Sequence, residues 1–531
     1  SNPDYIAFRD SLCGMAREMS PDTLVADSDG VFGLATASHD MSDVVMAGAG
    51  NGIGGAFDMG CYARDQVQKH GKPCVVHEFG YPESFPNTAD IPRYDQNLRP
   101  FWLRHTLEKA RAAGAERLLP LYVENSRKLH FQIVRRAIED MRTVDGLGGY
   151  GHWGFMDFVH ESIGLVDVFL GDKAGSAEAF ARSNGPVALS VKPDCGRMTG
   201  FAGQDYGFAV YLSSHGAAGR AGARALRCSL EIGGVAVSEC AAEIELRDFG
   251  VARAEGLALR APAADLPCHA TLRAEAPGVA ENSWDVWLFP RRQPPSGEGV
   301  VYLKDSWQTL NRLEALLPGC RGVAEAALWK RPPADVLVTA VLSGAVSDYL
   351  RRGGKVVLLP MYYANSSNGL PMLPSSFAPA PSFAGTQGAC GTVVSEHPCL
   401  DGFPHQGWCD YQFYDLLSGQ RMPPESVPFH NPGVQAFDLT PWPSGLEPII
   451  RSIPNWKTCA NRAYMFECRV GEGRLLACSL RVLETATLNP ESAWLLGGIA
   501  DYARGGSFAP KSHIGHADFE KLRAEASYTR L

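Results

Sequence analysis

Short apolar runs alternate with amphipathic stretches along the first part of the chain. Apolar runs of the kind found in buried strands lie at residues 23–27, 43–51, 73–79 and 148–158. Amphipathic stretches typical of helices lie at residues 1–23, 61–71, 94–114 and 126–144. In the first of these, Phe8, Leu12, Met15 and Met19 share one face. The alternation predicts a parallel α/β arrangement over residues 1–175.

The apolar runs carry too few polar positions for a sheet with one face in water. They favour the interior of a (β/α)8 barrel wrapped in helices. Such a barrel takes about 250 residues and eight strands, however, and the pattern predicts only four. Half a barrel would leave two open edges, which proteins avoid. We therefore expect residues 1–175 to supply strands 5–8, with the N-terminal half on another polypeptide or an earlier segment.

The hydrophobic pattern changes twice further along the chain. Residues 185–292 alternate apolar and polar positions between glycine-rich turns, which predicts an antiparallel β-sandwich. After the proline-rich linker "RRQPPSGEG", strand and helix signals alternate again over residues 298–510. This segment is expected to be a flavodoxin-like α/β domain. Residues 511–531 are interpreted as a peripheral tail.

Composition limits the partners of the 531-residue chain. A net charge of −9 without basic clusters argues against nucleic acid, and the absence of an apolar run near 18 residues argues against a membrane span. The 14 cysteines lack CxxC pairs and indicate mostly free, buried thiols. No metal site or other cofactor is expected. The compartment stays open; a periplasmic or secreted location is expected if an upstream signal peptide has been removed.

The segment "KPCVVHEFGYP" ends an apolar strand with a carboxylate, Glu78. Active sites of (β/α)8 barrels lie at the carboxyl ends of the strands, which is where Glu78 is expected. A buried-strand carboxylate is costly unless it is paired, solvated or functional. Two interpretations stay open: a carboxylate at the barrel rim held by an arginine, or a catalytic carboxylate of a glycosidase, which needs two such groups.

"KPCVVHEFGYP" followed by "GGYGHWGFMDF" resembles glycoside hydrolase family 2 and its retaining (β/α)8 clan, mainly over residues 1–175. The resemblance implies that Glu78 is the nucleophile, Trp153 the aromatic residue of the sugar subsite, and Asp157 a downstream acidic position with a structural or sugar-binding role. It further implies a retaining exo-β-glycosidase of the β-galactosidase, β-glucuronidase or β-mannosidase type, with a carbohydrate substrate.

Two positions depart from the family pattern. The family's acid/base is a glutamate, usually after asparagine, at the end of the fourth strand, and no Asn-Glu pair precedes the first helix here. The acid/base is therefore expected from outside this chain. The clan often has a tyrosine after the sixth strand that bonds the nucleophile. "AGAGNGIGGAF" has none, and Tyr62 or Tyr81 would have to replace it.

Other polar residues near strand ends are candidates for sugar contacts. Asn51 would end the sixth strand and donate to a sugar, or serve as a turn residue. Asp27 and Asp29 fit turn chemistry better than sugar binding. Glu124 is a candidate contact on a loop before a helix, where Asn125 would be a capping residue in the alternative interpretation.

Aromatic residues offer further alternatives. Trp153 would stack on a sugar face or pack in the barrel. Trp408 and Tyr411 would form a second carbohydrate patch, but such clusters are more often core. His152 is interpreted as a hydrogen-bonded histidine at the rim.

The last α/β domain resembles the class I glutamine amidotransferase fold found after the barrel in some β-galactosidases. An active amidotransferase needs a cysteine after the strand "KVVLL", where this sequence continues "PMYYANSS". A structural role or homo-oligomerisation is therefore expected of this domain. The rival to glycosidase activity is a degenerate carbohydrate-binding or scaffold protein that has lost its acid.

Overall fold

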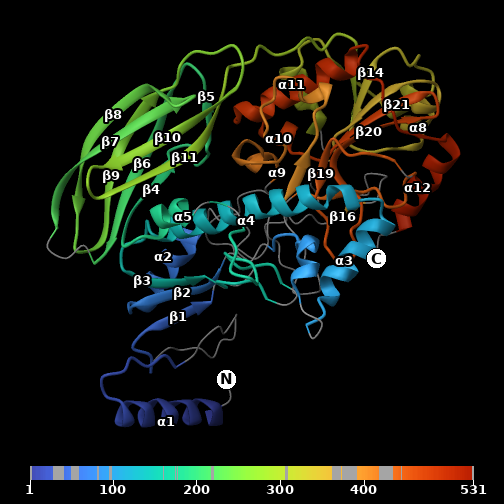
Figure 1. Ribbon diagram of the computed structural model, residues 1–531. Coiled ribbons are helices and arrows are strands. Elements are labelled where there is room, and N and C mark those ends of the chain that lie inside the picture. Colours follow the sequence, from blue (N-terminus) through green and yellow to red (C-terminus); the bar gives the residue numbers. More distant parts are fainter. Residues whose placement is uncertain are drawn as a thin grey trace.

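The protein is a mixed α/β structure with several sheets (Figure 1). The computed structural model describes residues 3–27, 41–48, 59–79, 83–94, 98–152, 154–158, 161–173, 175, 177–216, 220–304, 309–360, 372–373, 391–417, 434–443 and 445–528. No helix among these residues is long and apolar enough to cross a membrane.

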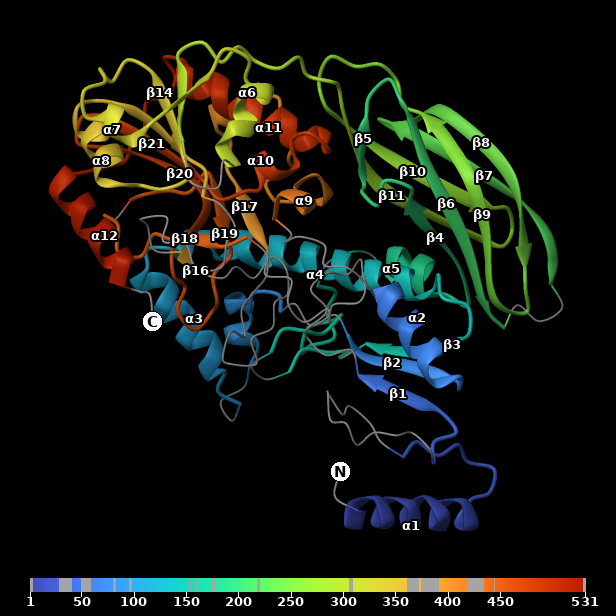
Figure 2. The same cartoon turned by 180° about the vertical axis from the view of Figure 1, so that it is seen from behind.

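The first helix, α1 (Pro3–Met19), stands apart from the other helices and strands (Figures 1 and 2). Its apolar face is open to solvent, with exposed fractions that run from 47% to 82% along the helix: Tyr5, Phe8, Leu12, Met15 and Met19. The spacing of these residues alternates between three and four, which keeps them on one stripe. The predicted helix and its apolar face are therefore present, and the face lies uncovered by the described residues.

Three parallel strands follow and form a half-barrel sheet. They are β1 (Val45–Gly48), β2 (Cys74–Phe79) and β3 (Leu147–His152), with β2 in the middle. The helices α2 (Met59–His70) and α4 (Leu119–Met141) contact each other, and residues of both join the strands in one apolar core. Parallel strands covered in this way read as apolar runs, which is why three of the four were predicted.

The strand predicted at residues 23–27 is absent; these residues are irregular. The backbone N–H of Val25 donates to a side-chain oxygen of Asp43, and its carbonyl accepts from the backbone N–H of the same residue. Asp27 accepts from the hydroxyl of Ser42 at 2.6 Å and from the amide of Met41 at 3.1 Å. The contacts of Val25 occupy the backbone groups that a strand ladder would need at this residue.

A loop with two short 3-10 helices leads into the longest helix. The 3-10 helices are η1 (Thr88–Arg93) and η2 (Glu116–Leu118), and the α-helix α3 (Phe101–Ala112) lies between them. The helix α4 follows η2 directly. α4 starts at Leu119, with a proline in its first turn, seven residues before the start predicted from the sequence at residue 126. In Figure 1, α4 runs beneath both the antiparallel sheets and the C-terminal sheet.

Residues 177–289 comprise α5 and two layers of strands that share one apolar core and are antiparallel except where β5 pairs with β11. One layer has the order β4-β6-β9, and the other β5-β11-β10-β7-β8. The elements are α5 (Ala177–Asn184), β4 (Val187–Pro193), β5 (Thr199–Phe201), β6 (Asp205–His215), β7 (Gly222–Ile232), β8 (Val235–Leu246), β9 (Phe249–Arg260), β10 (Cys268–Ala276) and β11 (Ala280–Phe289). The alternation of apolar and polar residues along these strands places the apolar side chains in the shared core.

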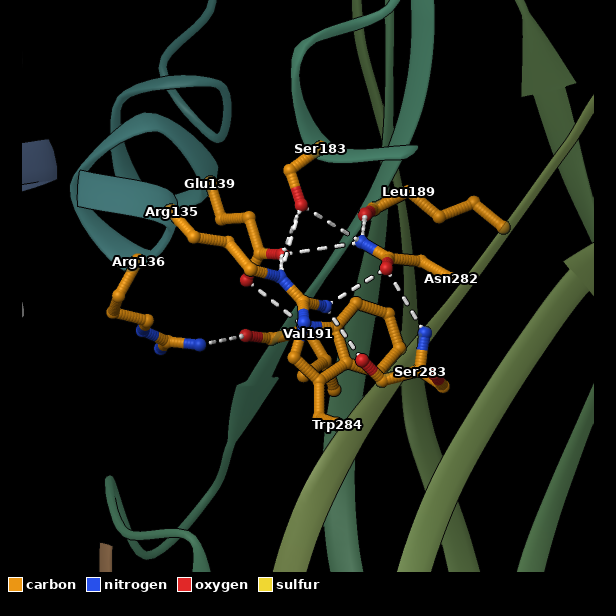
Figure 3. A network of polar contacts seen from close by, with 9 residues as sticks. All are labelled: Arg135, Arg136, Glu139, Ser183, Leu189, Val191, Asn282, Ser283 and Trp284. Carbon is orange, nitrogen blue, oxygen red and sulfur yellow. Dashed lines mark hydrogen bonds and ion pairs between the residues drawn. The ribbon is translucent and has the colours of Figure 1, made fainter. Parts of the chain in front are cut away.

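A buried polar network joins α4 to these layers (Figure 3). The Glu139 carboxylate accepts from Arg135 Nε at 2.9 Å, from Ser183 Oγ at 2.7 Å and from Trp284 Nε1 at 2.8 Å. Asn282 donates to the same carboxylate at 3.1 Å. Burial raises the pKa of Glu139, but nearby arginine charges and these bonds outweigh it and hold the pKa below its ordinary value.

The remaining residues build an 11-stranded mixed sheet. Its parallel centre, β13-β12-β14-β15-β21, is covered on both faces, and β20, β18 and β19 extend it antiparallel. The strands are β12 (Val300–Leu303), β13 (Arg321–Val323), β14 (Val336–Thr339), β15 (Lys355–Leu358), β16 (Met372–Leu373), β17 (Thr392–Val394), β18 (Ala436–Asp438), β19 (Ile450–Ser452), β20 (Arg462–Val470), β21 (Gly473–Cys478) and β22 (His513–Ile514).

Helices of this region fill the space around the mixed sheet. They are η3 (Thr309–Arg312), α6 (Leu313–Leu316), α7 (Glu325–Leu328), α8 (Gly344–Arg351), η4 (Pro398–Leu400), η5 (Tyr411–Phe413), α9 (Tyr414–Leu417), α10 (Val482–Thr485), α11 (Pro490–Arg504) and α12 (His516–Tyr528). Phe519 and Leu522 of α12 are buried in the core of the sheet. The last helix therefore packs as part of this region.

Candidate functional site

Glu78 lies at the carboxyl end of β2, the central strand of the half-barrel sheet. Its backbone is in the left-handed region, with φ of 55°. The register between β2 and β3 shifts between His77 and Phe79, so Glu78 occupies a bulge. Its side chain is half-buried. Left-handed backbone costs an L-residue with a side chain of this size about 1 to 3 kcal/mol and is typical of functional sites, as are bulges.

The backbone beside Glu78 is held by His152 at the end of β3. His152 Nδ1 lies 2.9 Å from the carbonyl oxygen of Phe79. A carbonyl only accepts, so this nitrogen carries the proton and donates. Burial lowers the pKa of His152 to about 4, so the ring is neutral near pH 7. The histidine predicted to be hydrogen-bonded at the rim thus fixes the strand end that carries Glu78.

A second histidine, His130 of α4, lies behind His152. The two ring centroids are 6.2 Å apart. His130 is 3% exposed, and burial lowers its pKa well below the ordinary value. Both rings are therefore neutral near pH 7 in the folded protein. The side chains behind the end of β2 thus carry no charge.

Asp157 lies five residues after the end of β3 and is 8% exposed. Its Oδ1 accepts from Lys173 Nζ at 2.7 Å and from the amide of Gly164 at 2.8 Å. A Cβ at Gly164 would lie 2.2 Å from the Asp157 nitrogen, so glycine alone fits there. Burial raises the pKa of Asp157, and the lysine charge opposes this. These contacts fit the structural alternative of the two predicted roles.

Glu124 and Asn125 lie within α4, so the prediction that they precede a helix is wrong. Glu124 is exposed and pairs with Lys128 at 2.6 Å, one turn along the helix. Asn125 is 3% exposed and donates to the carbonyl oxygens of Thr392 at 2.9 Å and Gly407 at 3.0 Å. The amide group therefore joins the helix to the C-terminal sheet region instead of capping it.

Several predicted site residues fall outside the described part of the chain. These are Asn51, Trp153, Asp29 and Tyr81, and their roles stay predictions. The hydroxyl of Tyr62 donates to the carbonyl of Gly48 at 2.8 Å. Its proton is thus directed at the end of β1.

The aromatic cluster in the C-terminal region is core. Trp408 is 7% exposed and belongs to the main apolar core, and Tyr411 packs against it. This agrees with the more ordinary of the two interpretations of these residues.

Glu83 is a second carboxyl close to the end of β2, and the sequence analysis missed it. It is 6% exposed. Burial raises its pKa to about 8, and the Glu161 carboxylate adds to this, while Lys457 and a hydrogen bond from Trp456 oppose it. In sequence, "PESFP" looks like a polar loop; two of the residues that interact with Glu83, Trp456 and Lys457, lie more than 370 positions later. A carboxyl this buried fits a structural contact with the C-terminal region, where Trp456 and Lys457 lie, better than a contact with a sugar.

Metal chemistry finds no support in the described residues. No group of three histidine, cysteine, aspartate or glutamate side chains there is placed to hold a metal ion. The arrangement at β2 offers a half-buried carboxylate backed by neutral histidines, which suits nucleophilic chemistry of the carboxylate.

Comparisons with known proteins place a family model on residues 337–524, described as a domain of unknown function (DUF8487). No curated protein matches the chain. Solved structures that resemble it include a β-glucuronidase from Parabacteroides merdae, with 12% identity and a TM-score of 0.23 over 55% of this chain and 34% of that one. A calcium-binding mutant of Bacteroides uniformis β-glucuronidase 2 has 13% identity and a TM-score of 0.20 over 56% and 31%.

A glycosyl hydrolase family 2 member from Bacteroides cellulosilyticus has 12% identity and a TM-score of 0.16 over 33% of this chain and 25% of that chain. The chain spans about a third of the length of the two β-glucuronidases. These neighbours are glycoside hydrolases. TM-scores of this size do not assign a fold, so the function has to be argued from the residues of this chain.

Proposed function

We propose that the protein is a retaining exo-β-glycosidase with Glu78 as its nucleophile. The observation that carries the proposal is the conformation of this residue: a half-buried carboxylate at the end of the central parallel strand, on a bulge, with φ of 55°. A strained backbone persists only where surrounding contacts hold it, and it clusters at active sites. The His152 bond to Phe79 is such a contact.

In the proposed reaction, Glu78 attacks the anomeric carbon and forms a glycosyl-enzyme. A second carboxyl protonates the leaving oxygen and then activates water, at roughly 5 to 5.5 Å from the first. We propose that this acid/base comes from outside residues 1–531. Trp153 would stack on the sugar and Asn51 would donate to a sugar hydroxyl, whereas Glu124 and Asp157 stay as predicted contacts with no further support.

The uncovered face of α1 and the edge of β1 support a proposal about the partner. β1 pairs on one side with β2 and has no other neighbour in the described sheet. An open strand edge and an exposed apolar helix face are each a docking surface for strands and helices. We propose that an N-terminal half of the enzyme, on a separate chain or an earlier segment, completes the barrel here.

The proposed layout assigns the three regions different tasks. Residues 1–175 supply half of the catalytic barrel, residues 185–292 a β-sandwich, and residues 298–510 a flavodoxin-like or amidotransferase-like domain. The last domain would be structural or support homo-oligomerisation. Its role in assembly is testable by measuring the mass of the purified assembly in solution.

The proposal is tested by trapping the glycosyl-enzyme. The full-length protein or native complex is screened against chromogenic β-galactosides, β-glucuronides and β-mannosides. It is then treated with the matching 2-deoxy-2-fluoro glycoside, which slows the second step. We expect the label on Glu78 in fragment-ion spectra of the peptide, which resolves Glu78 from Glu83. Glu78→Gln should abolish turnover and labelling and leave the circular dichroism spectrum unchanged.

Two outcomes would reject the assignment. Normal turnover of Glu78→Gln is one, and a label on Glu83 is the other. The rival, a carbohydrate-binding protein without catalysis, predicts sugar binding by calorimetry with neither turnover nor label. Glu178→Gln is the matched control, because Glu178 is an exposed glutamate of α5 that pairs with Arg182 and has no role in the proposed site.

A further inference from the structure

Two cysteines face each other across neighbouring strands of the five-stranded layer. β7 and β8 pair antiparallel, and Cys228 lies directly opposite Cys240 in their register. Both thiols are free. Directly opposite residues on antiparallel strands point to the same face of the sheet. The two sulfur atoms therefore lie on the inner face, toward the core that the two layers share.

The register brings the pair within the range of a disulfide. Directly opposite residues have Cα atoms about 4.5 to 5.5 Å apart, and disulfides need about 4.4 to 6.8 Å. The thiols also interact with each other. Burial raises the pKa of Cys228 to about 12, and a hydrogen bond with Cys240 adds to the increase. The same bond lowers the pKa of Cys240, against the effect of burial.

The two cysteines differ in access to solvent. Cys228 is 3% exposed and belongs to the apolar core. Cys240 is half-buried, and β8 is the edge strand of its layer. A soluble oxidant therefore reaches Cys240 first, and Cys228 lies next to it as the second thiol.

We propose that Cys228 and Cys240 form a redox couple that a low-molecular-weight disulfide converts into a cross-strand bond. The Cys240 thiolate attacks one sulfur of that disulfide, which forms a mixed disulfide and releases one small thiol. The Cys228 thiolate, after losing its proton to solvent, attacks the sulfur of Cys240 and displaces the second small thiol. Two protein thiols are oxidised, and one small disulfide is reduced to two thiols.

The bond would fasten the edge strand β8 to β7. Edge strands are the places where a sheet opens and pairs with other chains. In an oxidising compartment the couple would be closed throughout the life of the protein, and in a reducing one it would be open. The state of this pair would thus report the compartment that the sequence leaves open.

The test is a peptide map of the full-length protein. Trypsin releases both cysteines on one peptide, Cys228–Arg247, because no lysine or arginine lies between them. Protein is equilibrated with reduced or oxidised glutathione, quenched in acid, denatured and alkylated with N-ethylmaleimide. We expect two alkyl groups on this peptide after reduced glutathione. After oxidised glutathione we expect no alkyl group on this peptide. Its mass should then be lower by two hydrogen atoms than that of the reduced, unalkylated peptide.

Cys268 is the matched control, because it is also half-buried in this layer but lies opposite Leu288. Its peptide should be open to alkylation, or carry a single glutathione, after oxidised glutathione. In Cys240→Ser, the peptide should take one alkyl group under both conditions. Two alkyl groups on the native peptide after oxidised glutathione, or glutathione retained on Cys240 without closure, would overturn the proposal.

Discussion

At Glu78, the proposed activity and the stability of the fold make opposite demands. The proposed activity needs the carboxylate, whereas the backbone conformation makes any side chain destabilising. A side chain in the left-handed region costs free energy that glycine does not incur. The backbone at this position therefore favours glycine, yet a glutamate is present.

We predict that Glu78→Gly and Glu78→Ala both abolish turnover but differ in stability. Glu78→Gly should be the more stable of the two by roughly 1 kcal/mol, because alanine keeps the strain of a Cβ at positive φ. Urea unfolding of both variants measures the difference. Equal free energies of unfolding, or a more stable alanine variant, would show that the position carries no strain.

Glu83 gives a prediction about pH. Its folded-state pKa is raised from 4.5 to about 8, so the folded protein holds a proton that the unfolded chain has lost. The corresponding stability is complete below about pH 4.5 and is lost as the pH rises through about 8. The groups that face Glu83 are Glu161, Lys457, Lys173 and Trp456.

We predict that Glu83→Gln flattens this loss, so that the variant exceeds the native protein in melting temperature at pH 8 and loses the advantage near pH 5. Melting curves between pH 5 and 9 measure this. The control is Glu124→Gln, whose side chain is 57% exposed and should leave the pH profile unchanged. Parallel profiles for Glu83→Gln and the native protein would contradict the prediction.

At this scale, the sequence pattern correctly predicted that Glu78 lies at the end of an apolar strand, and its proposed role stays a prediction. The pattern could not give the bulge, since that depends on how β2 and β3 align across the 67 residues that separate them. Glu83 was beyond reach for the same kind of reason. Its segment looks solvent-exposed in sequence, and the residues that interact with it include Trp456 and Lys457 from a distant part of the chain.

Among the elements, α4 shows how a capping signal can mislead. "ENS" looks like the start of a helix, but Pro120 in the first turn is the true start signal. Asn125 and Ser126 have tertiary partners instead: Asn125 bonds two carbonyls of the C-terminal region, and Ser126 accepts from the amide of Phe85. Polar residues that favour caps also favour buried contacts of this kind.

We predict that Asn125→Ala destabilises the protein by about 1 to 3 kcal/mol, because the buried carbonyl oxygen of Thr392 loses the Asn125 donor, whereas that of Gly407 still accepts from the backbone N–H of Val394. Chemical unfolding measures the change. Lys128→Ala, on the exposed side of the same helix, should cost less than about 1 kcal/mol. Similar losses in the two variants would show that the amide bonds contribute little.

For the whole molecule, the sequence predicted a parallel α/β region, then antiparallel strands, then a second α/β region. It could do so because the spacing of apolar residues changes from alternating strand and helix patterns to strict alternation, and then back. Three of four predicted strands of the first sheet are present. Neither the nine-residue β20 nor the short antiparallel strands of the mixed sheet were predicted. β17, β18 and β19 are three residues each, too short to show a period.

The uncovered face of α1 leads to a prediction about the proposed complex with the barrel-completing half. A charged side chain on this face should weaken that complex. Phe8→Glu places a carboxylate in the centre of the face and should weaken docking of the proposed barrel-completing half. We expect lower kcat/KM on the chromogenic glycoside and faster tryptic cleavage within α1. Ala7→Glu is the control, since Ala7 is exposed but lies off the apolar stripe. Equal effects of the two variants would exclude this face as the docking surface.

The helix α4 has a consequence for anyone who wishes to divide the chain. It contacts β3 of the half-barrel sheet, β4 of the antiparallel layers and β17 of the mixed sheet. A gene fragment that starts after residue 175 would leave the amide of Asn282, the indole of Trp284 and the carbonyl of Thr392 without their partners on this helix. Expression of the C-terminal regions alone should therefore give insoluble protein. A soluble fragment would have to include α4, because all three regions pack against this helix.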